Sequence, residues 1–363
     1  MTDRLAIIMP SWVGDLVMAT PALRLIRDAR PNAEIHAIVR PGLDALLDGT
    51  GLVNHIHTAD ARNLGGPARL ARVLQPIRAS EALLLTNSFS TALGVRIARI
   101  PRRVGYARDA RGPMLTERLI APREHGHWSL IPAVRYYHHA GAAFIDPGCP
   151  PLTVLESDSL THAPLGDAAS AHLELGITPQ QQAHADQILA DINEPYAILN
   201  PGGNNPAKRW PTERFSALAD HLRRNHNLRV LVNGSPAETN LVEQITRDAR
   251  TDPVALPSLG PTLGSLKPII KNAQLMVTND TGPRHIAAAF GVPLVSLFGP
   301  TDPRWTTIPV RPLPDGSPSE TVLIANTDLD PTQTSNDDPQ ASRIDRIELG
   351  IVIRAADNLL TVQ

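Results

Sequence analysis

The stretch from Met276 to Pro303, MVTNDTGPRHIAAAFGVPLVSLFGPTDP, constrains the fold more than any other part of the chain. An apolar run ends at Asn279-Asp280, and Thr281-Gly282 then turns the chain into a short segment of helical character. Gly291 ends that segment, as glycine commonly ends helices, and a second apolar run follows it. The pattern predicts a buried strand, a tight turn, a helix and another buried strand, which is the repeating unit of α/β proteins.

The turn within this stretch has the features of an anion site. A strand that leads through a Thr-Gly turn into a helix aims backbone N–H groups and the positive end of the helix dipole at one point. Asp280 lies just before the turn and can accept hydrogen bonds from the hydroxyls of whatever carries the anion. A nucleotide-sugar diphosphate fits both features. An ordinary helix N-cap is the alternative, because Asp and Thr are common caps.

Length and composition limit the classes of protein that need to be considered. A chain of 363 residues, 42% of them hydrophobic, suits two domains with substantial cores. The net charge of −2 gives no global basic field, so we expect no nucleic-acid partner. Cys149 is the one cysteine, which excludes an intramolecular disulfide. No apolar run approaches the roughly 20 residues that cross a bilayer, so we expect a cytoplasmic protein with at most peripheral membrane contact.

The N-terminal part of the chain reads as strand, loop, helix and strand. Residues 5–9 and 35–39 are short apolar runs of the kind found in parallel sheets. Ligands of such sheets bind at the carboxyl ends of the strands. We therefore expect Asp15, together with Ser11 and Trp12 in the loop before it, to face a cleft. The alternative for Asp15 is a role as a helix cap.

A second group of polar residues follows another strand of this half. The strand 82–85 ends just before Asn87 and Ser88, and a positive segment comes next. Guanidinium groups suit phosphate or carboxylate ligands, whereas a solvated surface is the alternative for a run of charges. The segment carries Arg96, Arg99, Arg102, Arg103, Arg108 and Arg111.

The C-terminal half repeats the pattern of strand, loop and helix. The strand 197–200 runs into a Gly-rich loop, Pro201 to Lys208, and the strand 228–232 is followed closely by Glu238. The loop lacks the GxxxxGK[ST] motif, so it is not a Walker loop. It still offers backbone donors and one lysine near a strand end, which suits phosphate. An exposed lysine is the alternative for Lys208.

Two patterns could suggest a metal, and we expect neither to bind one. Four histidines lie close in sequence, but their spacing matches no common zinc pattern. Asp328 and Asp330 form a DxD pattern in a polar stretch, far from any strand-turn-helix unit. The histidines are His125, His127, His138 and His139.

Several blocks of the chain, taken in their order and spacing, resemble the family 9 glycosyltransferases, the ADP-heptose:lipopolysaccharide heptosyltransferases. The similarity runs from about residue 5 to about residue 304 and is greatest to the heptosyltransferase II members of the family. The blocks are PSWVGDLVMATPAL from Pro10, NSFSTAL from Asn87, IPRRVGYARDARGPML from Ile100, PGGNNPAKRWP from Pro201, VNGSPAE from Val232 and NDTGPRHIAAAFGVPLVSLFGPTDP from Asn279.

The resemblance implies a GT-B fold, in which two Rossmann-like, doubly wound domains face each other across a cleft. Residues 1–178 would form the acceptor domain and residues 179–345 the nucleotide-sugar domain. Residues 346–363 would form a C-terminal helix that could pack back on the N-terminal domain. The resemblance also implies an inverting mechanism with no cofactor and no essential metal.

The resemblance further assigns roles to residues of this sequence. Asp15 would be the general base. The donor site would comprise Gly203, Asn204, Lys208, Glu238, Asp280, Thr281, Gly282 and His285, with Glu238 on the ribose. The acceptor would meet Ser11, Trp12, Asn87, Ser88, Arg108 and Arg111.

Three features depart from the family pattern. Pro283-Arg284 stands where apolar residues usually precede the histidine, and Gly203-Asn204 replaces hydroxyl or acidic residues in the phosphate loop. A cysteine-containing segment near the C-terminus is missing, and residues 321–343 occupy its place. The departures bear on the identity of donor and acceptor more than on the fold.

The expected function is transfer of heptose from ADP-L-glycero-D-manno-heptose to the lipopolysaccharide inner core, on a heptose-primed Kdo–lipid A acceptor at the inner face of the cytoplasmic membrane. Another GT-B enzyme with a different nucleotide sugar or acceptor, including an epimerase, is an alternative. A non-catalytic nucleotide-sugar sensor is another. A dehydrogenase is disfavoured because no GxGxxG follows the first strand.

Overall fold

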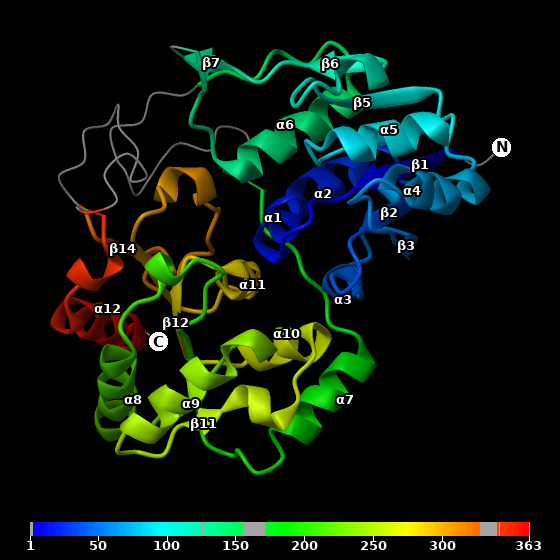
Figure 1. Ribbon diagram of the computed structural model, residues 1–363. Coiled ribbons are helices and arrows are strands. Elements are labelled where there is room, and N and C mark those ends of the chain that lie inside the picture. Colours follow the sequence, from blue (N-terminus) through cyan, green and yellow to red (C-terminus); the bar gives the residue numbers. More distant parts are fainter. Residues whose placement is uncertain (1–2, 125, 155–170, 327–339, 341, 363) are drawn as a thin grey trace. The chain divides into compact units, whose positions relative to one another are not determined.

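The computed structural model describes residues 3–124, 126–154, 171–326, 340 and 342–362 (Figure 1). Over these residues the chain forms two compact units, which divide between Gly176 and Ile177. Among the described helices, none is long and apolar enough to cross a bilayer.

The first unit is built on a parallel sheet. Within the described residues it has six strands in the order β3-β2-β1-β4-β5-β6. A two-stranded antiparallel hairpin, β7 (Arg123–Glu124) with β8 (His127–Trp128), lies outside this sheet. The sheet strands are β1 (Arg4–Ile8), β2 (Glu34–Val39), β3 (His55–Thr58), β4 (Glu81–Leu84), β5 (Arg102–Tyr106) and β6 (Glu117–Leu119).

Helices pack on both faces of this sheet. On one face α4 contacts α5, and Leu70 and Val95 from these helices join Ile8 and Leu84 from the strands in one buried cluster. Elsewhere α2 packs against α6. Pro21 lies in the first turn of α2, and a break at Ala19 separates α1 from α2. The helices are α1 (Val13–Met18), α2 (Thr20–Ala29), α3 (Asp44–Leu47), α4 (Gly66–Leu74), α5 (Phe89–Ile97) and α6 (Ala133–Ile145).

The second unit repeats this architecture. Its described residues form a six-stranded parallel sheet in the order β11-β10-β9-β12-β13-β14. The strands are β9 (Tyr196–Asn200), β10 (Arg229–Val232), β11 (Val254–Ala255), β12 (Leu275–Asn279), β13 (Leu294–Phe298) and β14 (Glu320–Ile324). The helices are α7 (Pro179–Ile188), α8 (Thr212–His226), α9 (Thr239–Asp248), α10 (Leu263–Lys271), α11 (Gly282–Phe290) and α12 (Leu349–Thr361).

Both sheets have the strand order of a Rossmann fold, which confirms the predicted pair of doubly wound α/β domains. In the first unit, β2 and β3 lie on one side of β1, and β4, β5 and β6 follow in order on its other side. In the second unit β9 and β12 occupy the positions of β1 and β4. The loops that leave the two central strands therefore diverge and leave room between them. The sequence reading missed β14, because its strand lies within a stretch rich in Pro, Ser and Asp.

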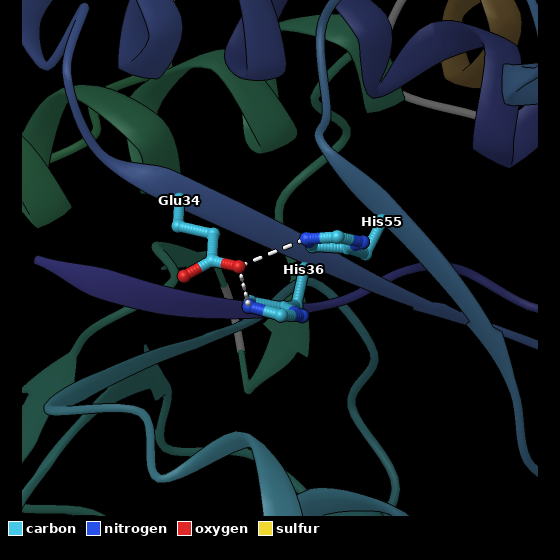
Figure 2. A group of neighbouring side chains, drawn as sticks. All are labelled: Glu34, His36 and His55. Carbon is cyan, nitrogen blue, oxygen red and sulfur yellow. Dashed lines mark hydrogen bonds and ion pairs between the residues drawn. The ribbon is translucent and has the colours of Figure 1, made fainter. Parts of the chain in front are cut away.

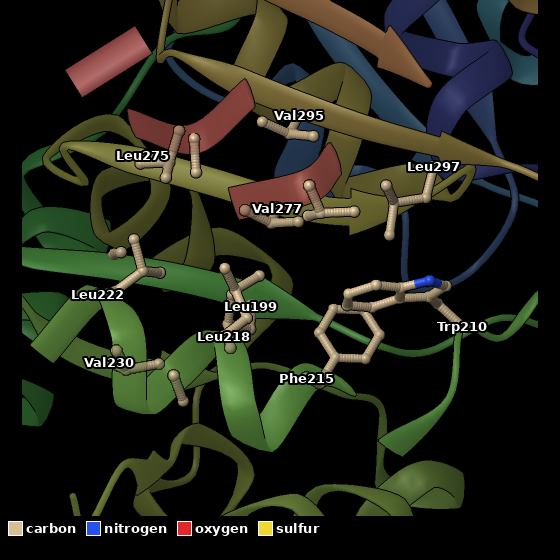
Figure 3. Packing of buried hydrophobic residues seen from close by; sticks show 14 of the residues in the cluster. Leu199, Trp210, Phe215, Leu218, Leu222, Val230, Leu275, Val277, Val295 and Leu297 are labelled. Atoms are coloured by element: carbon tan, nitrogen blue, oxygen red, sulfur yellow. The ribbon is translucent and has the colours of Figure 1, made fainter. Parts of the chain in front are cut away.

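The C-terminal helix belongs to the second unit. The sequence left open that it packs back on the N-terminal domain, but α12 buries its apolar residues Val352, Ala356 and Leu359 in the core of the second unit, beside α8. The same core holds Trp210, which lies edge-on to Phe215 with ring centroids 5.1 Å apart (Figure 3). The Trp210 indole N–H donates to the carbonyl of Ile347, 2.8 Å away, just before α12 begins.

We predict that Trp210→Ala lowers the free energy of unfolding by about 3–5 kcal/mol, because it leaves a cavity where α12 meets the sheet and removes the donor to Ile347. Urea denaturation of the full chain measures this loss. Leu259→Ala is the control in the same unit, since that side chain is 39% exposed and its loss should be below about 1 kcal/mol. Equal effects of the two substitutions would contradict the packing described here.

Candidate active site

A pocket of about 270 Å³ opens at the carboxyl ends of the central strands of the first unit. It lies where the strand order reverses, between the loop after β1 and the loop after β4. The region after β3, from Ala59 to Arg62, and Tyr137 on α6 also contribute to its lining. The expected residues in its lining are Ser11, Trp12, Asp15, Asn87 and Ser88.

Asp15 lies in the first turn of α1, as its sequence position suggested. A carboxylate there is favoured by the positive end of the helix dipole. Its Oδ1 accepts a hydrogen bond of 2.9 Å from the Tyr137 hydroxyl. Asp15 is thus a carboxylate on the pocket wall, with its direction set by a buried neighbour.

Tyr137 is a residue of the candidate site that the sequence analysis did not single out. It lies on the buried side of α6, and its hydroxyl contacts Asp15. Burial, and then the negative charge of Asp15, raise the pKa of the Tyr137 hydroxyl well above 10. The hydroxyl therefore keeps its proton at neutral pH and remains a donor to the carboxylate. No local sequence signal links positions 15 and 137.

Arg111 is a correction. We expected its guanidinium to meet the acceptor, but the side chain is fully buried. It donates to the carbonyls of Tyr106 and Thr86 and, at 3.3 Å, to Asn87 Oδ1. Burial lowers the Arg111 pKa to about 10, so the group stays charged at neutral pH. Arg111 positions Asn87 and the end of β4 from behind.

Asn87 receives a second hydrogen bond on the same oxygen, from the Tyr136 hydroxyl at 3.0 Å. With Oδ1 held by two donors, the amide orientation is fixed, and its N–H₂ group is the part that can serve a ligand. Ser88, at the start of α5, is exposed, and its hydroxyl lies 2.6 Å from that of Ser90.

Trp12, Ser11 and Arg108, which were expected to bind the acceptor, differ in exposure and contacts. Trp12 is 60% exposed, and the Arg40 guanidinium lies 5.9 Å from its ring centroid. Ser11 is exposed beside it. Arg108 stacks on the Trp128 ring at 4.1 Å, and its Nε is buried without a hydrogen-bond partner.

Three other arginines of the positive segment bind groups of the protein itself. Arg102 pairs with Glu117 at 2.6 Å and with Glu81, so it ties β5 to its neighbours on both sides. Arg103 donates to the carbonyls of Met114 and Ile100, and Arg96 donates to that of Pro113. Cross-strand ion pairs explain Arg102, and hydrogen bonds to backbone carbonyls explain Arg103 and Arg96.

In the second unit, the loop after β9 meets the turn after β12. Lys208 Nζ lies 3.2 Å from Asp280 Oδ2, and both side chains are largely buried, with 21% and 7% exposed. The pairing shows that Lys208 is not an ordinary solvent-exposed lysine. A lysine in this place presents positive charge at the carboxyl ends of the two central strands.

Asparagines at the strand ends hold this corner together. Asn200 Nδ2 donates to the hydroxyls of Thr278 and Thr281, and Asn233 Nδ2 donates to Asn200 Oδ1. Asn279 Nδ2 donates to the carbonyls of Pro201 and Gly202, so β12 fixes the Gly-rich loop directly. Sequence reading passed over Asn200 because it looked like the plain end of a strand.

The Thr281-Gly282 turn starts α11 as expected. The Thr281 side chain makes no capping hydrogen bond to the helix, because its hydroxyl is engaged with Asn200. His285 is buried, with Nδ1 3.2 Å from the Thr281 carbonyl, and its Nε2 has no partner. Burial lowers the His285 pKa to about 4, so the ring is neutral at physiological pH.

Arg284, one of the departures from the family pattern, is fully buried and has matching partners. Its guanidinium pairs with Glu320 of β14 at 2.6 Å and donates to the Thr306 carbonyl at 2.8 Å. It also lies 3.9 Å from Asp280 Oδ1. Asp280 therefore has a cation near each of its carboxylate oxygens, Lys208 near Oδ2 and Arg284 near Oδ1.

Glu238, expected on the ribose, is engaged inside the protein. Its Oε1 accepts from the Gly203 N–H at 2.6 Å, and its Oε2 accepts from the N–H and hydroxyl of Ser235. Burial would raise its pKa, but these hydrogen bonds outweigh burial and lower it. A Cβ at Gly202 would come within 2.5 Å of the carboxylate, so a larger residue there would displace the Glu238 side chain. The first role of Glu238 is to fix the loop that carries the exposed Asn204.

The histidines singled out for a metal are dispersed. His139 bridges the Tyr106 hydroxyl at 2.8 Å and the Pro150 carbonyl at 2.9 Å, and His138 lies beside it on α6. His127 is in β8, in the hairpin. His125, Asp328 and Asp330 lie outside the described residues.

Comparison with known proteins places these features in a family. Residues 68–326 match the family model for glycosyltransferase family 9 (heptosyltransferase). Lipopolysaccharide heptosyltransferase 2 of Escherichia coli K12 is 28% identical over 312 residues, covering 84% of each chain.

Solved structures share the fold. The E. coli ADP-heptose lipopolysaccharide heptosyltransferase II matches with a TM-score of 0.74 at 24% identity, over 99% of this chain and 98% of that one. The E. coli heptosyltransferase WaaC with ADP-2-deoxy-2-fluoro heptose matches with a TM-score of 0.64 at 15% identity, over 98% and 99%. With its two Rossmann-type sheets, the chain has the GT-B fold and belongs to glycosyltransferase family 9, the heptosyltransferases.

Proposed function

We propose that this enzyme transfers heptose from ADP-L-glycero-D-manno-heptose to the inner core of lipopolysaccharide, in the manner of heptosyltransferase II, with inversion and without a catalytic metal. The observation that carries the proposal is the carboxylate of Asp15, held by Tyr137 in a pocket at the carboxyl ends of β1 and β4. The names of its relatives, which include lipopolysaccharide heptosyltransferase 2 and a heptosyltransferase bound to an ADP-heptose analogue, support the choice of donor and acceptor.

In this proposal the acceptor binds the first unit. Ser11, Trp12, Asn87 and Ser88 at the pocket, with Arg108 near it, contact the sugars and their acidic groups, while Arg111 positions Asn87. Asp15 takes the proton from the acceptor hydroxyl as that oxygen attacks the anomeric carbon of the donor. The bond between this carbon and the phosphate oxygen breaks on the opposite face, which inverts the configuration.

The donor binds the second unit. Lys208 and the Thr281-Gly282 helix start serve the diphosphate, Asp280 the heptose hydroxyls, and Gly203 and Asn204 the phosphate loop. His285 supports the helix start from inside. The leaving ADP gains negative charge, and a fixed lysine aimed at that charge lowers the barrier. Lys208 is already desolvated and held by Asp280, which makes it a fixed group.

The acceptor class fixes where the enzyme would act. Lipid A is a membrane lipid and the donor is a nucleotide sugar, so we propose work at the inner face of the cytoplasmic membrane with peripheral contact only. Basic residues near an anionic bilayer contribute about 1 kcal/mol each to such contact.

The decisive measurement is ADP release from ADP-heptose with and without a heptose-primed Kdo–lipid A acceptor. We expect acceptor-dependent release that falls by about 10²–10⁴-fold in Asp15→Asn, with ADP binding intact, because the general base is removed. Asp44→Asn is the control, since Asp44 also lies in the first turn of a helix but outside the pocket. Undiminished turnover in Asp15→Asn would rule out Asp15 as the base.

Tyr137→Phe tests the positioning of that base. Removing the hydroxyl takes from Asp15 a donor that favours its ionised form, so the acid limb of the pH profile of kcat/KM should move to higher pH, and kcat should fall by about 10-fold. Tyr106→Phe, which removes another buried hydroxyl bound to His139, should leave the acid limb in place. An unshifted limb in Tyr137→Phe would leave Tyr137 with a packing role only.

Lys208→Met tests the donor side. We expect kcat to fall by about 10²–10³-fold, the range for losing one fixed group that stabilises developing charge, while the KM for the acceptor stays unchanged. The exposed Lys271→Met on α10 is the matched control and should behave as the wild type. A rise in the acceptor KM alone would contradict the assignment of Lys208 to the donor site.

A further inference from the structure

Three histidines and a glutamate gather on one face of the first sheet, away from every residue used above. Glu34 and His36 are two residues apart on β2 and point the same way, and the register pairs His36 with His55 of the edge strand β3. Figure 2 shows the Glu34 carboxylate and the two imidazole rings converging. The rings of His36 and His55 stack with centroids 4.6 Å apart, and His57 lies beside them.

His36 has an unexplained nitrogen. The residue is only 6% exposed, and its Nε2 is buried with no hydrogen-bond partner. Its Nδ1 lies 3.0 Å from His57 Nε2. If Nδ1 donates to His57, then Nε2 carries a bare lone pair that faces the carboxylate oxygen Glu34 Oε1 at 3.7 Å. In this tautomer a cation between the two electron-rich atoms would satisfy both of them.

The distances suit a small divalent ion. His36 Nε2 is 3.7 Å and His55 Nε2 is 2.9 Å from Glu34 Oε1, and the three residues offer ligand atoms within 4.8 Å of one another. With bonds of 2.0–2.1 Å, the ligands of a tetrahedral zinc ion lie about 3.3 Å apart, so the distances from Glu34 Oε1 to the two imidazole nitrogens are each within about 0.4 Å of that spacing.

The surrounding groups also match a metal site. A metal-bound histidine usually donates its other N–H to a neighbour that fixes the ring, and in this tautomer His57 is that neighbour for His36. Arg4 Nε holds the other oxygen of Glu34 at 2.8 Å and so orients the carboxylate. Burial, and then nearby His55, lower the His36 pKa to about 4, which leaves the neutral ring that a metal needs. His55 is about half exposed, which gives an ion and a fourth, water ligand a way in.

We propose that Glu34, His36 and His55 form a binding site for a divalent transition-metal ion of the zinc type, with water completing the coordination. The site is separate from catalysis. Arg4 and Glu34 pair at the amino ends of β1 and β2, whereas the pocket of Asp15 opens at the carboxyl ends.

The ion joins the edge strand to the sheet. β3 is short and has β2 as its one neighbour in the sheet, and it leads directly into residues 59–62 of the pocket wall. Four residue pairs with β2 hold β3 in the sheet. A metal ion bound by side chains of both strands adds a cross-link to this pairing. The expected role is therefore to stabilise this strand and the wall that follows it.

A second cluster in the described residues is a weaker candidate and serves as the control. His221 and His226 of α8 both contact one oxygen of Asp357, at 2.8 and 2.7 Å. Each ring already has a hydrogen-bond partner there, and the three side chains are partly exposed. Nothing in that cluster presents an unmatched buried atom.

The test is titration of the full-length protein, stripped with EDTA, with ZnCl₂ in competition with a chromophoric chelator. We expect one tight site in the wild type and at least about 10-fold weaker binding in His55→Ala, since even supporting groups of metal sites cost 10–100-fold. His55 is exposed at an edge, so this variant should fold, and circular dichroism checks it. His36→Gln should lose the same site.

Controls and a second readout separate this site from others. His226→Ala should keep the tight site, and His57→Phe should weaken it by about 10–100-fold. Zinc should raise the melting temperature of the wild type and not that of His55→Ala. Absence of a tight site in the wild type, unchanged affinity in His55→Ala, or its loss in His226→Ala would each overturn the proposal. None of these readouts depends on the substrates proposed above.

Discussion

In each half of the chain, the first three strands extend the sheet to one side of the first strand, and the next three extend it to the other side. The loops that leave β1 and β4 therefore run in opposite directions, and so do those that leave β9 and β12. This reversal of strand order is the constraint on which the rest depends. In the first unit the pocket lies at this point of reversal, at the carboxyl ends of the strands. What the sequence supplies is the chemistry of the walls: a carboxylate with its tyrosine in one unit, a lysine with its aspartate in the other.

The second unit balances its charges in pairs around Asp280. Lys208 contacts one carboxylate oxygen, and Arg284, itself tied to Glu320, stands 3.9 Å from the other. A diphosphate that draws Lys208 away would leave Asp280 still facing Arg284, so the buried carboxylate keeps a cation nearby. Removing one partner of a buried ion pair typically costs 3–5 kcal/mol, which explains why an arginine here comes with a glutamate on β14.

The periodicity of apolar runs was enough to predict two α/β halves and to put Asp15 and Thr281-Gly282 at strand ends, whereas the doubly wound domains were implied by the family resemblance. Short-range patterns do not show which side chains will be buried against distant partners. Arg111 looked like a ligand-binding arginine, yet its guanidinium reaches back to the end of β4. Tyr137 and Glu320 are separated from Asp15 and Arg284 by 122 and 36 positions, so only the packed structure joins them. The cross-strand pairing of His36 with His55 depends on register, which a run of alternating residues does not fix.

The placement of α12 has a consequence for how the protein is made. The described strands and helices of the first unit come from the first 145 residues, so its sheet can close while the ribosome is still translating the second unit. The second unit has to wait for β14 and for α12, which ends at residue 361, before Trp210 and the inner face of its sheet are covered. A nascent chain that stalls before α12 is made would therefore carry a folded first sheet and a second sheet with an exposed apolar face. That is the species a chaperone would meet.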